Sequence, residues 1–203
     1  MTARRPRARR QEVVVFTEGM ATEPSYIDAI KRMQTAFVVR VDDRHGTPGQ
    51  LVPIAMAELE RLTQESRHEG TTDAERPLVW CVVDRDQHEN VDALIARATA
   101  AGVRVAFSHP CIELWLLLHF EWHGQQEAGS CRRVTRAVES HISGYRQRGK
   151  RVRLEDVSGR YAQARGHAQR LNEQHRRDKL EVPTQRDPST NIWELADSLG
   201  ISY

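Results

Sequence analysis

Hydrophobic positions along the chain fall first into short continuous runs. Runs rich in β-branched residues are typical of strands that are buried on both faces of a parallel sheet. Val13 to Phe16 and Leu78 to Val83 are the clearest of these runs, and Phe37 to Val41 and Val103 to Phe107 are two further candidates. The sequence therefore predicts at least four strands in its first half.

Between these runs the apolar positions take helical spacing. Thr22 is the expected N-cap of a helix after the first strand, and its inward stripe is Tyr26, Ile27, Ile30 and Met33. Leu51 to Arg67 and Val91 to Ala101 have the same spacing. Strands that alternate with helices form βαβ units. We therefore predict an α/β fold with a mostly parallel sheet flanked by helices.

The second half of the chain reads as helical. We expect an apolar helix at Cys111 to Phe120, basic helices from Val134 onward and at Arg160 to Arg177, and a last helix capped by Ser189-Thr190. This pattern divides the chain into a disordered basic arm at 1–11, an α/β core at 12–125 and a helical basic extension at 126–203 that packs on the core.

Length and composition narrow the class of protein. The 203 residues suffice for one α/β domain with a helical extension. The longest apolar run, around Leu114 to Phe120, is far shorter than the roughly 20 residues of a membrane span, so no membrane partner is expected. Cys81, Cys111 and Cys131 form no CxxC pair, which indicates neither a disulfide framework nor a zinc knuckle and favours a cytoplasmic setting.

The distribution of charge is uneven although the net charge is only +2. Basic residues concentrate in the N-terminal arm and again from Arg132 to Arg177, whereas acids gather near the predicted strand ends. This asymmetry favours a polyanionic partner, RNA or DNA. A solvated arginine-rich surface explains the same charges equally well.

Acidic residues follow two of the predicted strands. Glu18 comes directly after the first, and Asp84 and Asp86 follow the strand at Leu78 to Val83. The carboxyl ends of parallel strands share one rim of a sheet, and residues two apart in an extended chain point to the same side. Carboxylates that converge from different elements suit a hard cation such as Mg²⁺. Turn chemistry or helix capping is the alternative explanation for the Asp-x-Asp pair.

Residues beside these acids admit two interpretations as well. Gly19 would let the backbone approach a phosphate closely, at the N-terminus of the following helix. Glu23 is either a further carboxylate of the site or an ordinary acid in the first turn of a helix, where it compensates the helix dipole.

The segment from Ser108 to Phe120 is the most unusual stretch of the chain. Glu113 projects from an otherwise apolar helix near the same rim, where a charge is costly unless it is paired or metal-bound. A capping box with Ser108 is the alternative. His109 and His119 could donate a proton to a leaving oxygen, or could simply pack.

Together these motifs resemble the RloB family, a Toprim-like group associated with anti-phage abortive infection in bacteria. The matching blocks are Thr17-Glu18-Gly19 with Thr22-Glu23-Pro24-Ser25-Tyr26, Val82-Val83-Asp84-Arg85-Asp86, the segment from Ser108 to Phe120, and Asp187-Pro188-Ser189-Thr190-Asn191. The segment from Ser108 to Phe120 is the most specific of them. His109, where the family pattern has Asn, and Ile112, where it has an aromatic, are departures.

The resemblance implies a Toprim core that binds Mg²⁺ through Glu18, Asp84 and Asp86. Mn²⁺ is an alternative metal, and Glu113 is a fourth catalytic candidate because of its position in the apolar helix. The resemblance also implies an RloA-type ABC ATPase as partner, and RNA, including transfer RNA, as a substrate option. A homo-oligomer is a further form to expect.

The function expected on these grounds is a metal-dependent nuclease that hydrolyses phosphodiesters of RNA or DNA and acts as an abortive-infection effector. Lys31, Arg85 and Lys150 are the basic residues considered for neutralising developing charge. The alternatives are a non-catalytic nucleic-acid-binding or regulatory subunit of an ABC-type ATPase complex and an enzyme acting on a small phosphorylated substrate. No Walker A motif is present, which disfavours a P-loop ATPase.

Overall fold

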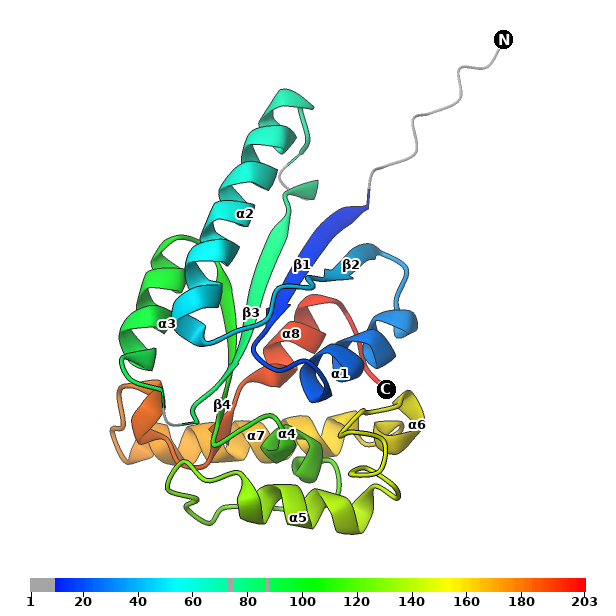
Figure 1. The fold of residues 1–203 in the computed structure, drawn as a ribbon, viewed down its shortest axis with the longest axis vertical. Helices are drawn as coiled ribbons and strands as arrows, with labels where there is room; N and C mark the ends of the chain where they lie inside the picture. The colour runs from blue at the N-terminus through cyan, green and yellow to red at the C-terminus, as the bar shows by residue number, and fades with distance from the viewer. Residues whose placement is uncertain (1–9, 73–74, 87) are drawn as a thin grey trace.

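The structure is a computed structural model that describes residues 10–72, 75–86 and 88–203. Five strands form one sheet in the order β2-β1-β3-β4-β5, in which the first four strands run parallel and β5 is antiparallel to β4. The strands are β1 (Gln11–Thr17), β2 (Phe37–Val41), β3 (Leu78–Asp84), β4 (Arg104–His109) and β5 (Ser189–Thr190). The predicted α/β class and mostly parallel sheet are confirmed (Figure 1).

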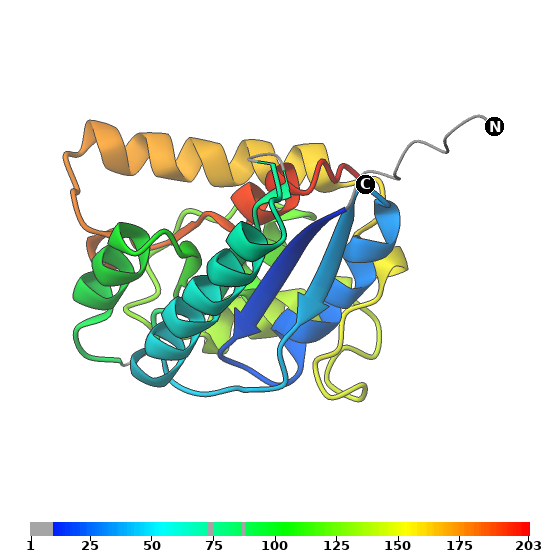
Figure 2. The same cartoon turned by 90° about the horizontal axis from the view of Figure 1, so that it is seen from above.

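Helices cover both faces of the sheet. The first half contains α1 (Thr22–Ile30), the 3₁₀ turn η1 (Lys31–Met33), α2 (Pro48–His68), α3 (Val91–Ala100) and α4 (Glu113–Leu118). The second half contains α5 (Arg132–His141), α6 (Leu154–Val157), α7 (Tyr161–Arg177), the 3₁₀ turn η3 (Pro183–Gln185) and α8 (Ile192–Ser198). Figure 2 shows β1 between α2 on one side and α1 on the other.

Alternation along the buried strands produces two hydrophobic cores. Val14 and Phe16 face α2 and α3, whereas Val13 and Val15 face α1 and α4, because successive strand residues point to opposite faces. The second core also takes in buried residues of α5, α6, α7 and α8. The chain after residue 125 therefore shares a core with the strands, while the predicted boundary at that residue stays a prediction.

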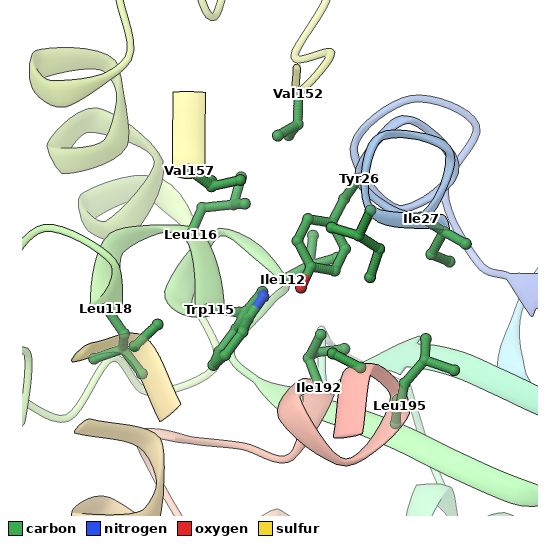
Figure 3. Packing of buried hydrophobic residues seen from close by; sticks show 14 of the residues in the cluster. Tyr26, Ile27, Ile112, Trp115, Leu116, Leu118, Val152, Val157, Ile192 and Leu195 are labelled. Atoms are coloured by element: carbon green, nitrogen blue, oxygen red, sulfur yellow. The ribbon is translucent and has the colours of Figure 1, made fainter. Parts of the chain in front are cut away.

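The short helix α4 lies at the centre of the larger core. All six of its residues are buried, and the five after Glu113 are apolar on every side of the helix, which is typical of the interior. Figure 3 shows Trp115 and Leu116 surrounded by side chains from α1, α6, α8 and the loop before α6: Tyr26, Val157, Ile192 and Val152. This complete burial explains why Glu113, at the start of α4, is also buried.

Three local predictions differ from the structure. Met33 is 45% exposed, because the tighter 3₁₀ turn η1 replaces the last turn of α1 and rotates Met33 out of the inward stripe. Ser189-Thr190 forms β5, so Asn191 is the N-cap of α8. Ser108 is part of β4, where its hydroxyl lies 2.9 Å from that of Thr190, so it does not cap α4.

Two further expectations concern the N-terminal arm and the cysteines. Of the predicted arm at 1–11, residues 1–9 lie outside the described part of the chain, and β1 already begins at Gln11. Cys111 and Cys131 form a disulfide in the structure, which corrects the expectation of unpaired cysteines. Within the described ranges, none of the helices has the length and apolar character needed to cross a bilayer.

Candidate functional site

The first and third strands are neighbours, and this pairing brings Glu18 to Asp84. From β1 the chain continues to β2 on one side, while β3 pairs with the other side of β1, so a topological switch point lies between β1 and β3. Crevices at the carboxyl ends of strands at such points are the usual binding sites of parallel α/β sheets. The backbone N–H of Asp84 donates to Oε2 of Glu18 at 3.1 Å. The predicted common rim is therefore present (Figure 1).

Glu18, Asp86 and His88 form an outer ligand group at this rim. Each offers one ligand atom, and these atoms lie within 4.8 Å of one another. His88 Nε2 is 2.5 Å from Oε1 of Glu18. The extended geometry predicted for the Asp-x-Asp pair ends at Asp84, because β3 stops there and Asp86 has a φ of 31°. The turn thus brings Asp86 together with Glu18 and His88.

Asp84 belongs instead to a second set, the inner acids Glu23, Asp84 and Glu113, which are all buried. Burial raises the pKa of Asp84 well above its usual value, and the nearby carboxylates of Glu23, Glu113 and Glu18 raise it further. Oδ1 of Asp84 is buried and has no hydrogen-bond partner among the described residues. This carboxylate is therefore poorly stabilised by the protein itself.

Burial also destabilises the charged forms of Glu18 and Glu23. Burial raises the pKa of Glu18, although the N–H of Asp84 and the ring of His88 act in the opposite direction. Burial likewise raises the pKa of Glu23, and the charge of Glu113 adds to the effect. Crowded buried carboxylates of this kind are costly unless a positive charge joins them.

Gly19 makes room for Glu23. The N–H of Gly19 donates to Oε1 of Glu23 at 3.1 Å. A Cβ at Gly19 would lie 2.9 Å from Cδ of Glu23, so a side chain here would displace the carboxylate. The space that the sequence suggested for a phosphate is occupied by Glu23, which lies in the first turn of α1 and also faces the site.

Glu113 is held by two partners from a distant loop. Its Oε1 accepts a hydrogen bond from the hydroxyl of Tyr145 at 3.2 Å and lies 2.9 Å from Nζ of Lys150. The Tyr145 hydroxyl is also 3.1 Å from that of Thr22, at the start of α1. The predicted capping box with Ser108 is absent, and the buried carboxylate is instead ion-paired.

The other two basic candidates do not point at the inner acids. Nη1 of Arg85 donates to the backbone carbonyls of Asp86 and His88, at 3.2 and 2.8 Å, and so stabilises the turn that carries them. Lys31 follows the C-terminal end of α1, whereas the site adjoins the N-terminal end, and its ammonium pairs with Asp28 at 2.6 Å.

The two candidate histidines have structural partners. His109 Nε2 is 3.8 Å from Oδ2 of Asp187, and burial lowers its pKa. His119 is fully buried, with Nδ1 2.9 Å from the carbonyl of Trp115 and Nε2 2.9 Å from the hydroxyl of Tyr203. Burial lowers the pKa of His119 to about 4, so it is a neutral core residue at pH 7.

A loop before α5 forms one wall of the site. The disulfide of Cys111 and Cys131 ties this loop to the chain just before α4, and Sγ of Cys131 is 3.6 Å from Oδ1 of Asp86. A Cβ at Gly129 would lie 3.3 Å from the carbonyl of Asp86, so the loop lies close to the outer ligands. A hollow of about 510 Å³ is lined by Asp86, His88, Ala128, Gly129, Ser130 and Cys131.

The donor set fits a divalent metal ion. Glu18 and Asp86 supply carboxylate oxygens, which hard cations such as Mg²⁺ and Mn²⁺ prefer, and His88 supplies a nitrogen that Mn²⁺ also accepts. The unpartnered Oδ1 of Asp84 adds a neighbouring oxygen without a donor in the described chain. A cation at this position would relieve the repulsion among the acids.

His88 is the candidate ligand that the sequence interpretation missed. It comes two residues after Asp86 in an Asp-x-Asp-x-His pattern, which was the available signal. The strand ends at Asp84 and Asp86 has a positive φ, and His88 Nε2 lies beside Oε1 of Glu18. Alternation along a strand cannot predict that contact.

Fold and site together define an α/β protein with a carboxylate cluster at the switch point of a mostly parallel sheet. A family model described as RloB-like protein matches residues 13–199. The chain therefore belongs to the RloB-like family, as the resemblance of its motifs indicated. Searches of the curated proteins and of the solved structures gave no match.

Proposed function

We propose that this protein is a Mg²⁺-dependent, Toprim-like nuclease that hydrolyses phosphodiester bonds of RNA or DNA. The observation that carries the proposal is the buried carboxylate of Asp84 among Glu18, Glu23 and Glu113, whose Oδ1 has no hydrogen-bond partner among the described residues. Such a cluster costs folding free energy, and recruiting a cation is a common reason to retain it.

Each residue of the site then has a definite task. Glu18, Asp86 and His88 would hold the metal ion, and Mn²⁺ is an alternative to Mg²⁺. When bound, the ion supplies a Lewis acid that polarises phosphate and lowers the pKa of water. The inner acids Glu23, Asp84 and Glu113 add negative charge behind the outer ligands. The turn that Arg85 stabilises keeps Asp86 and His88 in position.

Charge outside the site supports a nucleic-acid substrate. Arg132 and Arg136 are exposed on α5, directly after the loop that lines the site, and neither makes an ion pair within the described ranges. Unpaired cations beside an acidic metal site suit a phosphate backbone, which supplies most of the non-specific affinity for nucleic acids.

The first experiment is a cleavage assay with labelled single- and double-stranded RNA and DNA, with Mg²⁺, with Mn²⁺ and with EDTA. We expect cleavage that requires the cation and is lost in Asp86→Ala and Asp84→Asn. The matched control is Asp43→Ala, because Asp43 is an exposed aspartate in the loop after β2, outside the acidic cluster. Full activity of either site variant would refute the assignment.

Metal binding is measured separately by calorimetry. Cation binding and nucleic-acid binding without cleavage would favour the non-catalytic alternative, a regulatory subunit of an ABC-type ATPase complex. A change in cellular nucleotide pools, detected by mass spectrometry, would favour a small phosphorylated substrate.

The biological setting is a further part of the proposal. Membership of the RloB-like family supports a role as an effector of anti-phage abortive infection that is triggered by an RloA-type ABC ATPase. Co-expression with such an ATPase and sequencing of RNA and DNA ends, beside the Asp84→Asn variant, tests both the partner and the substrate. Transfer RNA is the first substrate to examine.

A further inference from the structure

The geometry points to Lys150 as the residue that binds a phosphate oxygen of the substrate at the acidic site. This inference deepens the proposed function and rests on it. Among the described lysines and arginines, Lys150 alone forms an ion pair with Glu18, Glu23, Asp84 or Glu113, since Nζ is 2.9 Å from Oε1 of Glu113.

The backbone at Lys150 is fixed against α1 and against its own loop. Its N–H donates to the carbonyl of Tyr145 at 2.9 Å, and its carbonyl accepts a hydrogen bond from the hydroxyl of Thr22 at 3.2 Å. Two residues later, the N–H of Val152 donates to the hydroxyl of Ser25 at 2.8 Å. These contacts join the loop to the first turns of α1, so the stem of Lys150 begins from a defined position.

Lys150 adopts a φ of 62°, in the left-handed region that side chains other than glycine rarely occupy. Loops commonly place glycine or asparagine at such positions, and a lysine there costs conformational energy. The side chain compensates part of that cost through its ion pair with Glu113. A functional role for the ammonium gives a reason for a lysine at this position.

The two side chains of this ion pair differ in their exposure to solvent. The Glu113 side chain is only 5% exposed, whereas that of Lys150 is 47% exposed. The ammonium therefore lies between the buried acids and solvent, and can donate to Glu113 and to an incoming anion at once, because Lys carries three donors. Phosphate is the anion that a metal site of this kind would receive.

The remaining basic candidates are committed elsewhere. The guanidinium of Arg85 donates to backbone carbonyls of its own turn, and Lys31 pairs with Asp28 beyond the far end of α1. Once a bound cation balances the inner acids, the attraction of Glu113 for Lys150 weakens and the ammonium is available for phosphate.

The test compares Lys150→Ala and Lys150→Arg with the matched control Lys179→Ala. Lys179 is also an exposed lysine with positive φ, 57°, but it follows α7, and no ion pair of its side chain occurs in the described structure. Calorimetry measures two affinities for each protein: that for Mn²⁺ alone, and that for thymidine 3′,5′-bisphosphate in saturating Mg²⁺. Circular dichroism establishes that each variant is folded.

Only the affinity for the bisphosphate should fall, and a merely structural residue would not separate the two affinities in this way. Lys150→Ala should lose about 10- to 100-fold in affinity for the bisphosphate, as for a lost charge-assisted hydrogen bond. Its affinity for Mn²⁺ should be unchanged or higher, because a cation beside Glu113 has been removed. Lys150→Arg should recover most of the bisphosphate affinity, and Lys179→Ala should match the wild type in both measurements.

Other outcomes overturn the inference. Wild-type protein that fails to bind the bisphosphate contradicts it, and so does Lys150→Ala with unchanged bisphosphate affinity or with equal losses of both affinities. A wild type that binds metal and bisphosphate but cleaves no nucleic acid contradicts the proposed nuclease alone, so the two failures are distinguishable. In a cleaving enzyme, Lys150→Ala should also lower kcat/KM.

Discussion

Replacing Asp84 with Asn should stabilise the metal-free protein, although it should abolish activity. Oδ1 of Asp84 is buried without a partner in the described chain, and burial, followed by the charges of Glu23 and Glu113, raises the pKa of this carboxyl. An amide of nearly the same shape removes one charge and supplies donors toward those carboxylates. Relief of an unsatisfied buried acceptor is worth about 1–3 kcal/mol of unfolding free energy.

The increase in unfolding free energy that Asp84→Asn produces should depend on pH in a defined direction. The pKa of Asp84 is higher in the folded than in the unfolded protein, so the folded state binds more protons and the stability of the wild type falls as pH rises through this interval. Below about pH 4 Asp84 is protonated in both states, and the variant should gain little. Above it the gain should grow by up to about 1.4 kcal/mol per pH unit, until the raised pKa is passed.

A matched variant at Asp42 should behave in the opposite way. Asp42 accepts hydrogen bonds from Arg40 and Arg44, and the pairing with Arg44 lowers its pKa to about 2. Because the pKa of Asp42 is lower in the folded than in the unfolded state, its carboxylate stabilises the fold at pH values above the unfolded pKa near 4. This stabilisation is lost as the pH falls toward 2. Asp42→Asn should therefore cost about 2 kcal/mol at neutral pH. The same chemical change thus has opposite signs at two buried aspartates.

The assay is urea unfolding in EDTA across about pH 4 to pH 8. The informative quantity is the difference between variant and wild type, because His119, with a pKa of about 4, destabilises the wild type on acidification and cancels in the difference. Adding Mg²⁺ should stabilise the wild type, by about 2.7 kcal/mol at 100 times the dissociation constant, and should stabilise Asp84→Asn less. A variant less stable than the wild type in EDTA at neutral pH would refute the reasoning.

Three further predictions concern other parts of the molecule. Reducing the disulfide of Cys111 and Cys131 should lower the unfolding free energy by about 3 kcal/mol and Tm by about 6–12 °C, and calorimetric scans of Cys131→Ser should show no effect of reductant. His88→Ala should weaken Mn²⁺ binding by about 10- to 100-fold in calorimetry without a comparable loss of stability. Trp115→Ala should cost about 3–5 kcal/mol in urea unfolding, because Trp115 is fully buried in the larger core.

The strands could be predicted from sequence because burial on both faces leaves a continuous apolar run. The run at Leu78 to Val83 became β3 with a single added residue, Asp84. β5 has only two residues, Ser189 and Thr190, and no periodicity can reveal so short a strand. Its pairing depends on β4, more than 80 residues away, through contacts such as that of Ser108 with Thr190.

The candidate site shows the same division between local and distant information. Glu18 and Asp84 were predictable as strand-end acids, but their adjacency depends on which strands pair, and a local pattern does not specify this. The contact of Lys150 with Glu113 and the disulfide of Cys111 with Cys131 likewise join segments that are far apart in the chain. Candidate residues could be predicted when they lay on a single element. Contacts between residues of two different elements could not.

The arrangement of the acids in two sets explains how the site could hold a cation that still exchanges with solvent. Glu18, Asp86 and His88 would contact an ion at the rim, while Asp84 is buried among the inner acids and its Oδ1 has no hydrogen-bond partner among the described residues. Coulomb attraction from the inner set acts over several ångströms in a low-dielectric interior, so it strengthens binding without adding ligands that would close the coordination sphere. Positions for water and phosphate oxygens would therefore stay open at the rim, as the proposed hydrolysis requires. Removing an inner charge should lower the affinity for the ion, whereas removing an outer ligand should change the coordination geometry of the ion.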